Sequence, residues 1–177
     1  MNIPVFLSYA SPYNEEQRLF IKKVQDFLRS RGLEPRTLGV TDYDNDEPLT
    51  AIRRLMLESN GLLAIAFRRY YIEEGKEKPL SKNETVISDQ YFSSPWCQIE
   101  PAMAFQLGLP ILLFRESGVI ANGVLERGVI GTYLPEFDLS KPIDTYFESE
   151  EWLQLIGVWE GSVRAVRKAK GTPPRLY

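Results

Sequence analysis

The sequence of 177 residues contains no histidine and a single cysteine, Cys97. The absence of histidine excludes a Ser/His/Asp triad, a Cys/His dyad and a His-ligated zinc site. One cysteine cannot form an intrachain disulfide, which favours a reducing, cytoplasmic setting. Any chemistry must therefore depend on carboxylates, hydroxyls or backbone groups.

Long apolar runs and an excess of one charge are also absent. No run approaches the roughly 18 residues that span a bilayer, and residues 1–10 carry no basic segment of a secretion signal. The 21 Lys and Arg residues nearly balance the 24 Asp and Glu residues, which gives a net charge of −3. We therefore expect a soluble, unexported protein that binds neither a nucleic acid nor a membrane.

Two kinds of ligand-binding motif are missing as well. No glycine-rich phosphate loop is present, so we expect no dinucleotide as a resident cofactor. Asp42, Asp44 and Asp46 have the spacing that begins a calcium loop. Glu47 stands where that loop needs glycine, and Arg53 stands where it needs glutamate. We therefore predict a solvated acidic loop and no metal site.

The order of apolar segments predicts one α/β domain over residues 1–177. Short β-prone runs alternate with stretches of helical periodicity, which is typical of a doubly wound, mostly parallel sheet with helices on both faces. The expected strands are residues 4–8, 33–38, 61–67, 110–114 and 129–134. The expected helices are residues 15–31, 48–59, 96–107 and 148–170, with a weak helix or a loop at 118–127.

The polar stretch 68–94 shows little periodicity and is long for a connection within a compact unit. We interpret it as an inserted surface loop with some helix.

The expected fold also indicates where a ligand would bind. In open parallel sheets the ligand crevice lies beyond the carboxyl ends of the strands. The segments that follow Ser8, Leu38 and Phe67 should therefore converge there, together with the start of the helix that carries Trp96.

The segment Ser94-Pro95-Trp96-Cys97-Gln98-Ile99-Glu100 has the pattern of a helix start. Ser94 can cap the helix, and Pro95 suits its first position. Trp96 and Glu100 are one turn apart and share a face, which suits a planar cationic ring held beside a carboxylate. Pro101 should kink the helix directly after Glu100.

The same segment resembles the third-helix motif of TIR domains, and Phe6-Leu7-Ser8-Tyr9 resembles the first sequence box of that family. Leu38-Gly39 is loosely similar to the loop motif after the second strand of the family. The resemblance covers most of the chain in element order. It implies a flavodoxin-like TIR fold with five strands.

The resemblance further implies an enzyme that cleaves the nicotinamide–ribose bond of NAD, with NAD as substrate. Glu100 would then be the catalytic residue, because a carboxylate stabilises the positive charge that develops on the ribose. The product would be ADP-ribose or a cyclic ADP-ribose isomer. The residues expected to bind the substrate are Ser8, Tyr9, Ala10, Arg36, Leu38, Trp96 and Cys97.

The resemblance also implies partners. TIR enzymes generally form their pocket between neighbouring protomers, so self-association is expected. A role in antiphage defence would add an effector protein that responds to the nucleotide product.

Two other functions remain open. The segment from Glu100 to Ile111 also resembles the nucleophile segment of nucleoside deoxyribosyltransferases, which break N-glycosidic bonds too. A TIR module can also act as an adaptor without any catalysis, with Glu100 as a surface charge.

Overall fold

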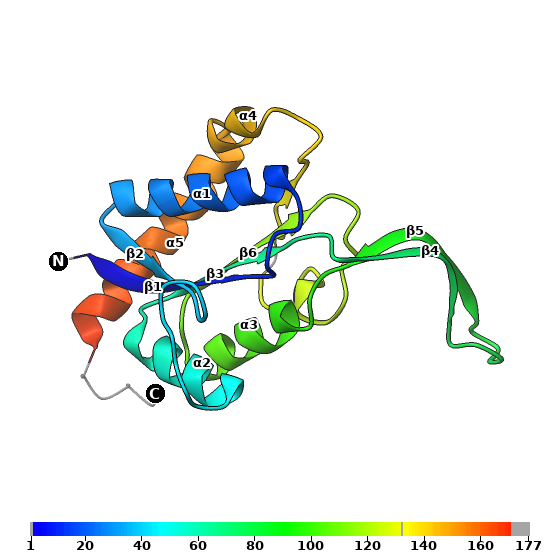
Figure 1. The fold of residues 1–177 in the computed structure, drawn as a ribbon, viewed down its shortest axis with the longest axis horizontal. Helices are drawn as coiled ribbons and strands as arrows, with labels where there is room; N and C mark the ends of the chain where they lie inside the picture. The colour runs from blue at the N-terminus through cyan, green and yellow to red at the C-terminus, as the bar shows by residue number, and fades with distance from the viewer. Residues whose placement is uncertain (1, 132, 171–177) are drawn as a thin grey trace.

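The computed structural model describes residues 2–131 and 133–170. Within them a five-stranded parallel sheet lies between two layers of helices, and a two-stranded hairpin extends from one end (Figure 1). The strands of the main sheet are β1 (Ile3–Tyr9), β2 (Leu33–Arg36), β3 (Leu62–Ala66), β6 (Ile111–Glu116) and β7 (Glu136–Phe137). The helices are α1 (Glu15–Ser30), α2 (Pro48–Glu58), α3 (Trp96–Gln106), α4 (Ile143–Phe147) and α5 (Glu150–Ala169), with a 3-10 turn η1 (Gly123–Leu125).

The strand order β2-β1-β3-β6-β7 is that of flavodoxin-like sheets, which confirms the predicted doubly wound α/β class. All four neighbouring pairs are parallel. The order reverses between β1 and β3, because the chain adds β2 on one side of β1 and all later strands on the other. Connections that leave the sheet in opposite directions open a crevice beyond the C-terminal ends of these two strands.

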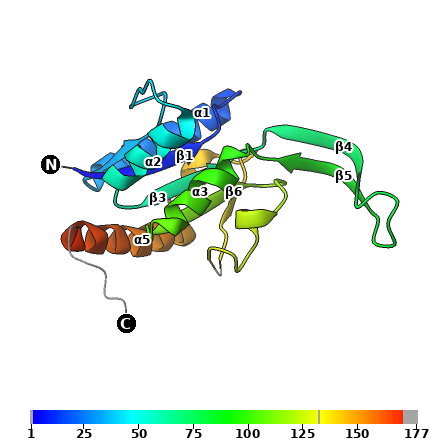
Figure 2. The same cartoon turned by 90° about the horizontal axis from the view of Figure 1, so that it is seen from below.

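Each face of the sheet has its own hydrophobic core, and β3 supplies both. Leu63 and Ile65 pack under α1 and α5, whereas Leu62, Ala64 and Ala66 pack under α2 and α3. Successive side chains of a strand point to opposite faces, so a strand buried on both sides must be continuously apolar. Figure 2 shows α2 and α3 along one face of the sheet, with α1 and α5 beyond it.

Polar caps fix the first turns of the two longest helices. The Asn14 side chain accepts a hydrogen bond from the Gln17 amide at 2.8 Å, and the Ser149 hydroxyl accepts one from the Trp152 amide at 3.2 Å. Gly32 follows α1 with a φ of +74°, the left-handed conformation that glycine adopts most readily at a helix end.

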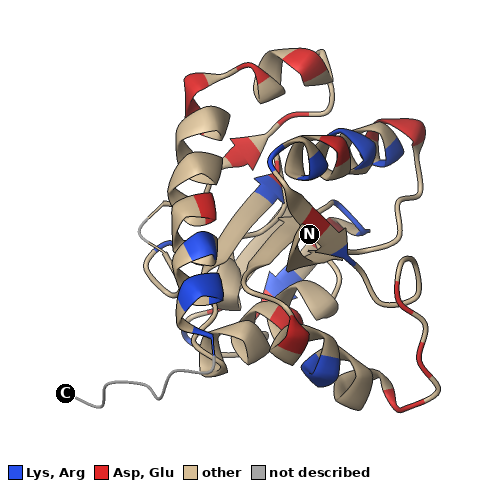
Figure 3. Ribbon diagram, turned by 90° about the vertical axis from the view of Figure 1, so that its left-hand side faces the viewer, with Lys and Arg blue, Asp and Glu red and all other residues tan. Residues whose placement is uncertain are grey.

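The charges are mixed along the ribbon. Basic and acidic positions alternate on α1, and acidic positions recur in the loop before α2 (Figure 3). No helix within the described ranges is both long enough and apolar enough to cross a bilayer.

The segment 68–94 is not a partly helical loop, so this prediction was wrong. It forms an antiparallel hairpin of β4 (Tyr70–Glu77) and β5 (Thr85–Phe92), which projects from the body of the protein in both views (Figures 1 and 2). β4 carries three Glu residues, a Lys and a glycine, which are depleted in strands generally, and neither strand shows a regular alternation of apolar residues. The sequence of the hairpin therefore only weakly indicates two β-strands.

Three further boundaries differ from prediction. The fifth strand is the two-residue β7 at Glu136–Phe137 and does not lie at 129–134. The second strand ends at Arg36, where a turn of residues 37–42 begins. The weak helix expected at 118–127 is reduced to the 3-10 turn η1.

A close contact at Gly61 sets the distance between α5 and the sheet. A Cβ atom at this position would lie 2.6 Å from Val163 Cγ2 and 3.2 Å from the Pro110 carbonyl oxygen. Gly157 of α5 itself has no neighbour that a Cβ would meet within 4 Å. The two glycines therefore have opposite structural requirements.

We predict that Gly61→Ala lowers the free energy of unfolding by about 1–3 kcal/mol, because α5 must shift to admit the methyl group. Gly157→Ala should raise it by up to about 1 kcal/mol through helix propensity. Denaturant unfolding of both variants measures the two effects, and equal effects would contradict the close packing at Gly61.

Candidate functional site

A cavity of about 500 Å³ opens at the C-terminal ends of β1 and β3, where the strand order reverses. Its walls come from the end of β1, the loop after β2, the first turns of α2 and α3, and the base of the hairpin. The lining residues are Phe6, Leu7, Ser8, Tyr9, Ala10, Ser11, Thr37, Leu38, Pro48, Ile52, Arg69, Tyr70, Ser94, Pro95, Trp96 and Glu100. The size is within the range of small-molecule sites.

Glu100 contributes a buried carboxylate to this cavity. Its side chain belongs to α3, and the residue is 9% exposed. Burial raises the pKa of Glu100 to about 7, because the charged form loses its hydration. No Lys or Arg side chain among the described residues offsets this effect. At neutral pH the carboxyl group is therefore divided between its protonated and ionised forms.

Ser8 is the polar neighbour of this carboxyl group. It is 1% exposed, and its Oγ forms no hydrogen bond of normal geometry within the described chain. The hydroxyl lowers the pKa of Glu100, but this effect is smaller than that of burial. The Ser8 hydroxyl is therefore a buried polar group directly beside the Glu100 carboxyl group.

Two other buried carboxylates of the protein have partners. Glu116 accepts hydrogen bonds from Gln17 Nε2 at 3.1 Å and from the Arg68 amide at 2.9 Å. Glu160 forms ion pairs with Arg31 and Arg164, at 2.8 Å and 2.7 Å. Glu100 is therefore distinguished by burial beside an open cavity without a compensating charge, which is typical of functional sites.

Aromatic side chains surround the cavity. Trp96 lies one turn before Glu100 and is 39% exposed, and Tyr9 and Tyr70 also line the walls. Flat faces of this kind can pack against a base or a nicotinamide ring.

The start of α3 differs slightly from prediction. The helix begins at Trp96, with Pro95 in the capping position. The Ser94 hydroxyl accepts a hydrogen bond from the Trp96 amide at 3.3 Å, so its capping contribution is weak. α3 continues through Pro101 to Gln106, and Glu100 still lines the cavity.

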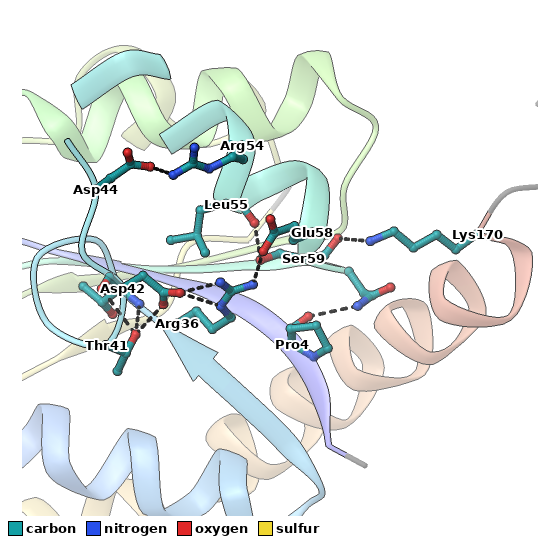
Figure 4. A network of polar contacts seen from close by, with 12 residues as sticks. Pro4, Arg36, Thr41, Asp42, Asp44, Arg54, Leu55, Glu58, Ser59 and Lys170 are labelled. Carbon is teal, nitrogen blue, oxygen red and sulfur yellow. Dashed lines mark hydrogen bonds and ion pairs between the residues drawn. The ribbon is translucent and has the colours of Figure 1, made fainter. Parts of the chain in front are cut away.

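Among the expected substrate-binding residues, Ser8, Tyr9, Ala10, Leu38 and Trp96 all line the cavity, whereas Arg36 does not. The Arg36 guanidinium pairs with Asp42 and donates to Glu58 at 2.6 Å (Figure 4). A second pair, between Arg54 and Asp44, joins the same acidic loop to α2. These ion pairs hold the loop that forms one wall of the cavity.

Cys97 also lies outside the cavity lining. Its side chain is buried in the core beneath α3, and its thiol contacts the Ile65 carbonyl oxygen at 3.7 Å. Burial raises the pKa of the thiol to about 11, so it stays protonated at neutral pH. The structure therefore gives Cys97 a packing position.

Several lining residues were not singled out from the sequence, above all Arg69 and Tyr70 at the base of the hairpin. Their position soon after the third strand is the signal that could have identified them, because segments after Phe67 were expected at the crevice. Thr37 and Pro48 lie in the stretch 36–48 after the second strand, which was expected at the crevice, whereas Ile52 of α2 was not expected there. Within the described residues, no group of three or more Cys, Asp or Glu side chains could hold a metal ion.

Known proteins resemble this chain in fold. No protein-family model matches it, and no curated protein matches its sequence. A CMP N-glycosidase from Clostridium botulinum is 18% identical with a TM-score of 0.50, over 88% of this chain and 98% of that chain. A flavodiiron core from Synechocystis is 12% identical with a TM-score of 0.51, over 95% of this chain and 37% of that chain. TIR domains of the activated Roq1 resistosome are 16% identical with a TM-score of 0.43, over 96% and 86% of the two chains.

We predict that Glu100→Gln stabilises the protein in a pH-dependent way. The folded-state pKa of Glu100, about 7, lies above its ordinary value of 4.5, so folding is weakened as pH rises from 4.5 to 7. Glutamine removes the charge at every pH. Its stabilising effect should be small at pH 4.5 and reach up to roughly 3 kcal/mol at pH 8.

Denaturant unfolding of the wild type and Glu100→Gln at both pH values measures this difference. The same change in stability at pH 4.5 and pH 8 would show that burial does not raise the pKa of this carboxyl group.

Proposed function

We propose that this protein is an enzyme that cleaves the N-glycosidic bond of a nucleotide, with Glu100 as its catalytic carboxylate. The observation that carries the proposal is the position of Glu100, which is buried without a cationic partner and lines an open cavity. Such a carboxylate destabilises the fold and is suited to stabilise a positive charge on a bound substrate.

The reaction begins with cleavage of the bond between C1′ of the ribose and the nitrogen of the base. The bonding electron pair leaves with the base, and C1′ acquires oxocarbenium character. The Glu100 carboxylate stabilises this charge from within the cavity, where low polarity strengthens the interaction. A water molecule or a nucleophilic atom of the substrate then adds to C1′.

The substrate that we propose first is NAD. Nicotinamide leaves from NAD as a neutral molecule, because the bound ring carries a positive charge. Its departure therefore needs no general acid, and a histidine-free cavity is sufficient. Trp96 and Tyr9 would pack against a ring of the substrate, and Ser8 would contact the ribose. ADP-ribose and a cyclic ADP-ribose isomer both remain possible products.

The resemblance to TIR domains in residues 94–100 supports a biological setting within the same proposal. NAD cleavage in the cytoplasm would serve antiphage defence, either by depletion of NAD or through a nucleotide product that an effector protein binds.

A nucleoside monophosphate is the second candidate substrate. The fold is similar over nearly the whole length of a CMP N-glycosidase, which supports this substrate class. A pyrimidine leaves as an anion unless it is protonated, so its cleavage would also use the protonated form of Glu100 or an acid from solvent. The two substrates should therefore differ in pH dependence.

We predict that Glu100→Gln lowers NAD cleavage at least about 100-fold. In the wild type, kcat/KM for NAD should rise with pH and level off above pH 7, because the ionised carboxylate is the active form and its pKa is about 7. Mass spectrometry of nicotinamide and of the linear and cyclic products measures the rate and decides the product.

The matched control is Glu160→Gln, which removes a buried carboxylate at the far end of the sheet from the cavity. This variant should retain wild-type turnover under all conditions in which it is folded. CMP and deoxynucleosides are assayed in parallel. If CMP or a deoxynucleoside is cleaved while NAD stays intact, that compound and not NAD is the substrate. An adaptor would show no turnover, and Glu100→Gln would leave its partner binding unchanged.

We further propose that activity requires self-association, as the TIR resemblance implies. Turnover per chain should then increase with protein concentration, because more chains are assembled. A dilution series with parallel light scattering measures both quantities. Constant turnover per chain over the whole series, with the protein monomeric, would exclude this requirement.

A further inference from the structure

The cavity contains two residues with opposite charge. Among its described lining residues, Arg69 is the only Lys or Arg, and Glu100 is the only Asp or Glu. A nucleotide also carries charge of two signs during cleavage of its glycosidic bond, since the phosphate is anionic and C1′ becomes cationic.

Arg69 is held in place by one backbone hydrogen bond and one side-chain hydrogen bond. Its amide donates to the Phe92 carbonyl oxygen at 2.9 Å, across the base of the hairpin. Its Nη1 donates to the Ser11 carbonyl oxygen at 2.8 Å, and the guanidinium forms no ion pair within the described chain. An arginine has five N–H donors, so most of them remain free for a ligand.

The preceding residue, Arg68, differs in this respect. Its amide donates to Glu116, its Nε donates to the Ser117 carbonyl oxygen at 2.5 Å, and its guanidinium lies 4.7 Å from the centre of the Tyr91 ring. Arg68 therefore joins the base of the hairpin to Glu116 at the end of β6 and to Ser117, whereas Arg69 lines the cavity beside Ser11.

The Glu100 carboxyl group and the Arg69 guanidinium lie near opposite ends of the short segment 8–11. Ser8 lies beside Glu100, and Ser11 lies beside Arg69. Three residues span at most about 10 Å, even when they are fully extended. The segment 8–11 is therefore short enough for one ribose 5-phosphate, whose C1′ and phosphate occupy opposite ends of the sugar, to lie along it.

We infer that Arg69 binds the 5′-phosphate of the substrate and restricts the enzyme to nucleotides over free nucleosides. The inference rests on the proposed function, because it places C1′ at Glu100. The fork of N–H donors suits a phosphate, and the charge of arginine persists at every physiological pH. The monophosphate of a nucleoside monophosphate and the diphosphate of NAD share this chemistry.

The first test measures binding without catalysis. Titration calorimetry with ribose 5-phosphate and with ribose should show at least about 10-fold tighter binding of the phosphate ester to the wild type. Arg69→Gln should abolish this preference, and Arg69→Lys should retain part of it. Arg29→Gln is the matched control, because Arg29 pairs with Glu34 near the start of β2, whereas the cavity lies beyond the end of that strand. Thermal unfolding of each variant checks that it is folded.

The second test measures cleavage of CMP against cytidine and of NAD against nicotinamide riboside. The wild type should prefer the phosphorylated member of the pair that it cleaves, and Arg69→Gln should raise KM for that member about 10- to 100-fold and thereby reduce the ratio of kcat/KM for the phosphorylated over the unphosphorylated member. The pair that is cleaved identifies the source of the phosphate.

The outcomes separate the two proposals. A phosphate preference that disappears in Arg69→Gln supports the phosphate site, even if no substrate is cleaved and the proposed function fails. Cleavage of nucleosides and nucleotides at equal rates overturns the phosphate site and leaves the proposed function intact. Preference for phosphate that persists in the folded Arg69→Gln variant also overturns the role of Arg69.

Discussion

The constraint on which the site depends is the burial of a carboxyl group at a core position of a helix. Cys97, Glu100 and Ala104 have the spacing of one face of α3, and all three are buried against the sheet. Cys97 and Ala104 contact the core, so they fix the rotation of the helix about its axis. Glu100 is thereby held at the end of β1, where the sheet no longer fills the space beneath it. Its low hydration is a consequence of how its neighbours pack.

The two faces of the sheet are stabilised in different ways. Beneath α1 and α5, aromatic rings pack closely, and the ring centres of Phe20 and Phe137 are 4.1 Å apart. Beneath α2 and α3 the core is mostly aliphatic, and ion pairs hold the loop before α2 together with the packing of Leu38 against this core. The cavity lies on this second side. A rigid aromatic layer therefore supports a site whose walls are built from loops, as is common for binding sites on stable scaffolds.

Much of this arrangement could be predicted from the sequence. The continuous apolar run at residues 62–66 identified the central strand, and the rule for parallel sheets brought Ser8, Leu38 and Trp96 to one crevice with Glu100. The hairpin could not be predicted, because both of its faces are largely exposed and no alternation of apolar residues marks its strands. The ion pairs of Arg36 and the position of Arg69 depend on contacts between elements that are distant in sequence, and local patterns contain no information about them.

The absence of histidine gives the buried carboxyl group a further consequence. Histidine is the side chain whose ordinary pKa lies closest to neutrality, and this chain has none. The shift of Glu100 to about 7 places a titration in the neutral range at the lining of the cavity. A change of pH near neutrality would thus alter the charge inside the cavity of a chain that contains no imidazole.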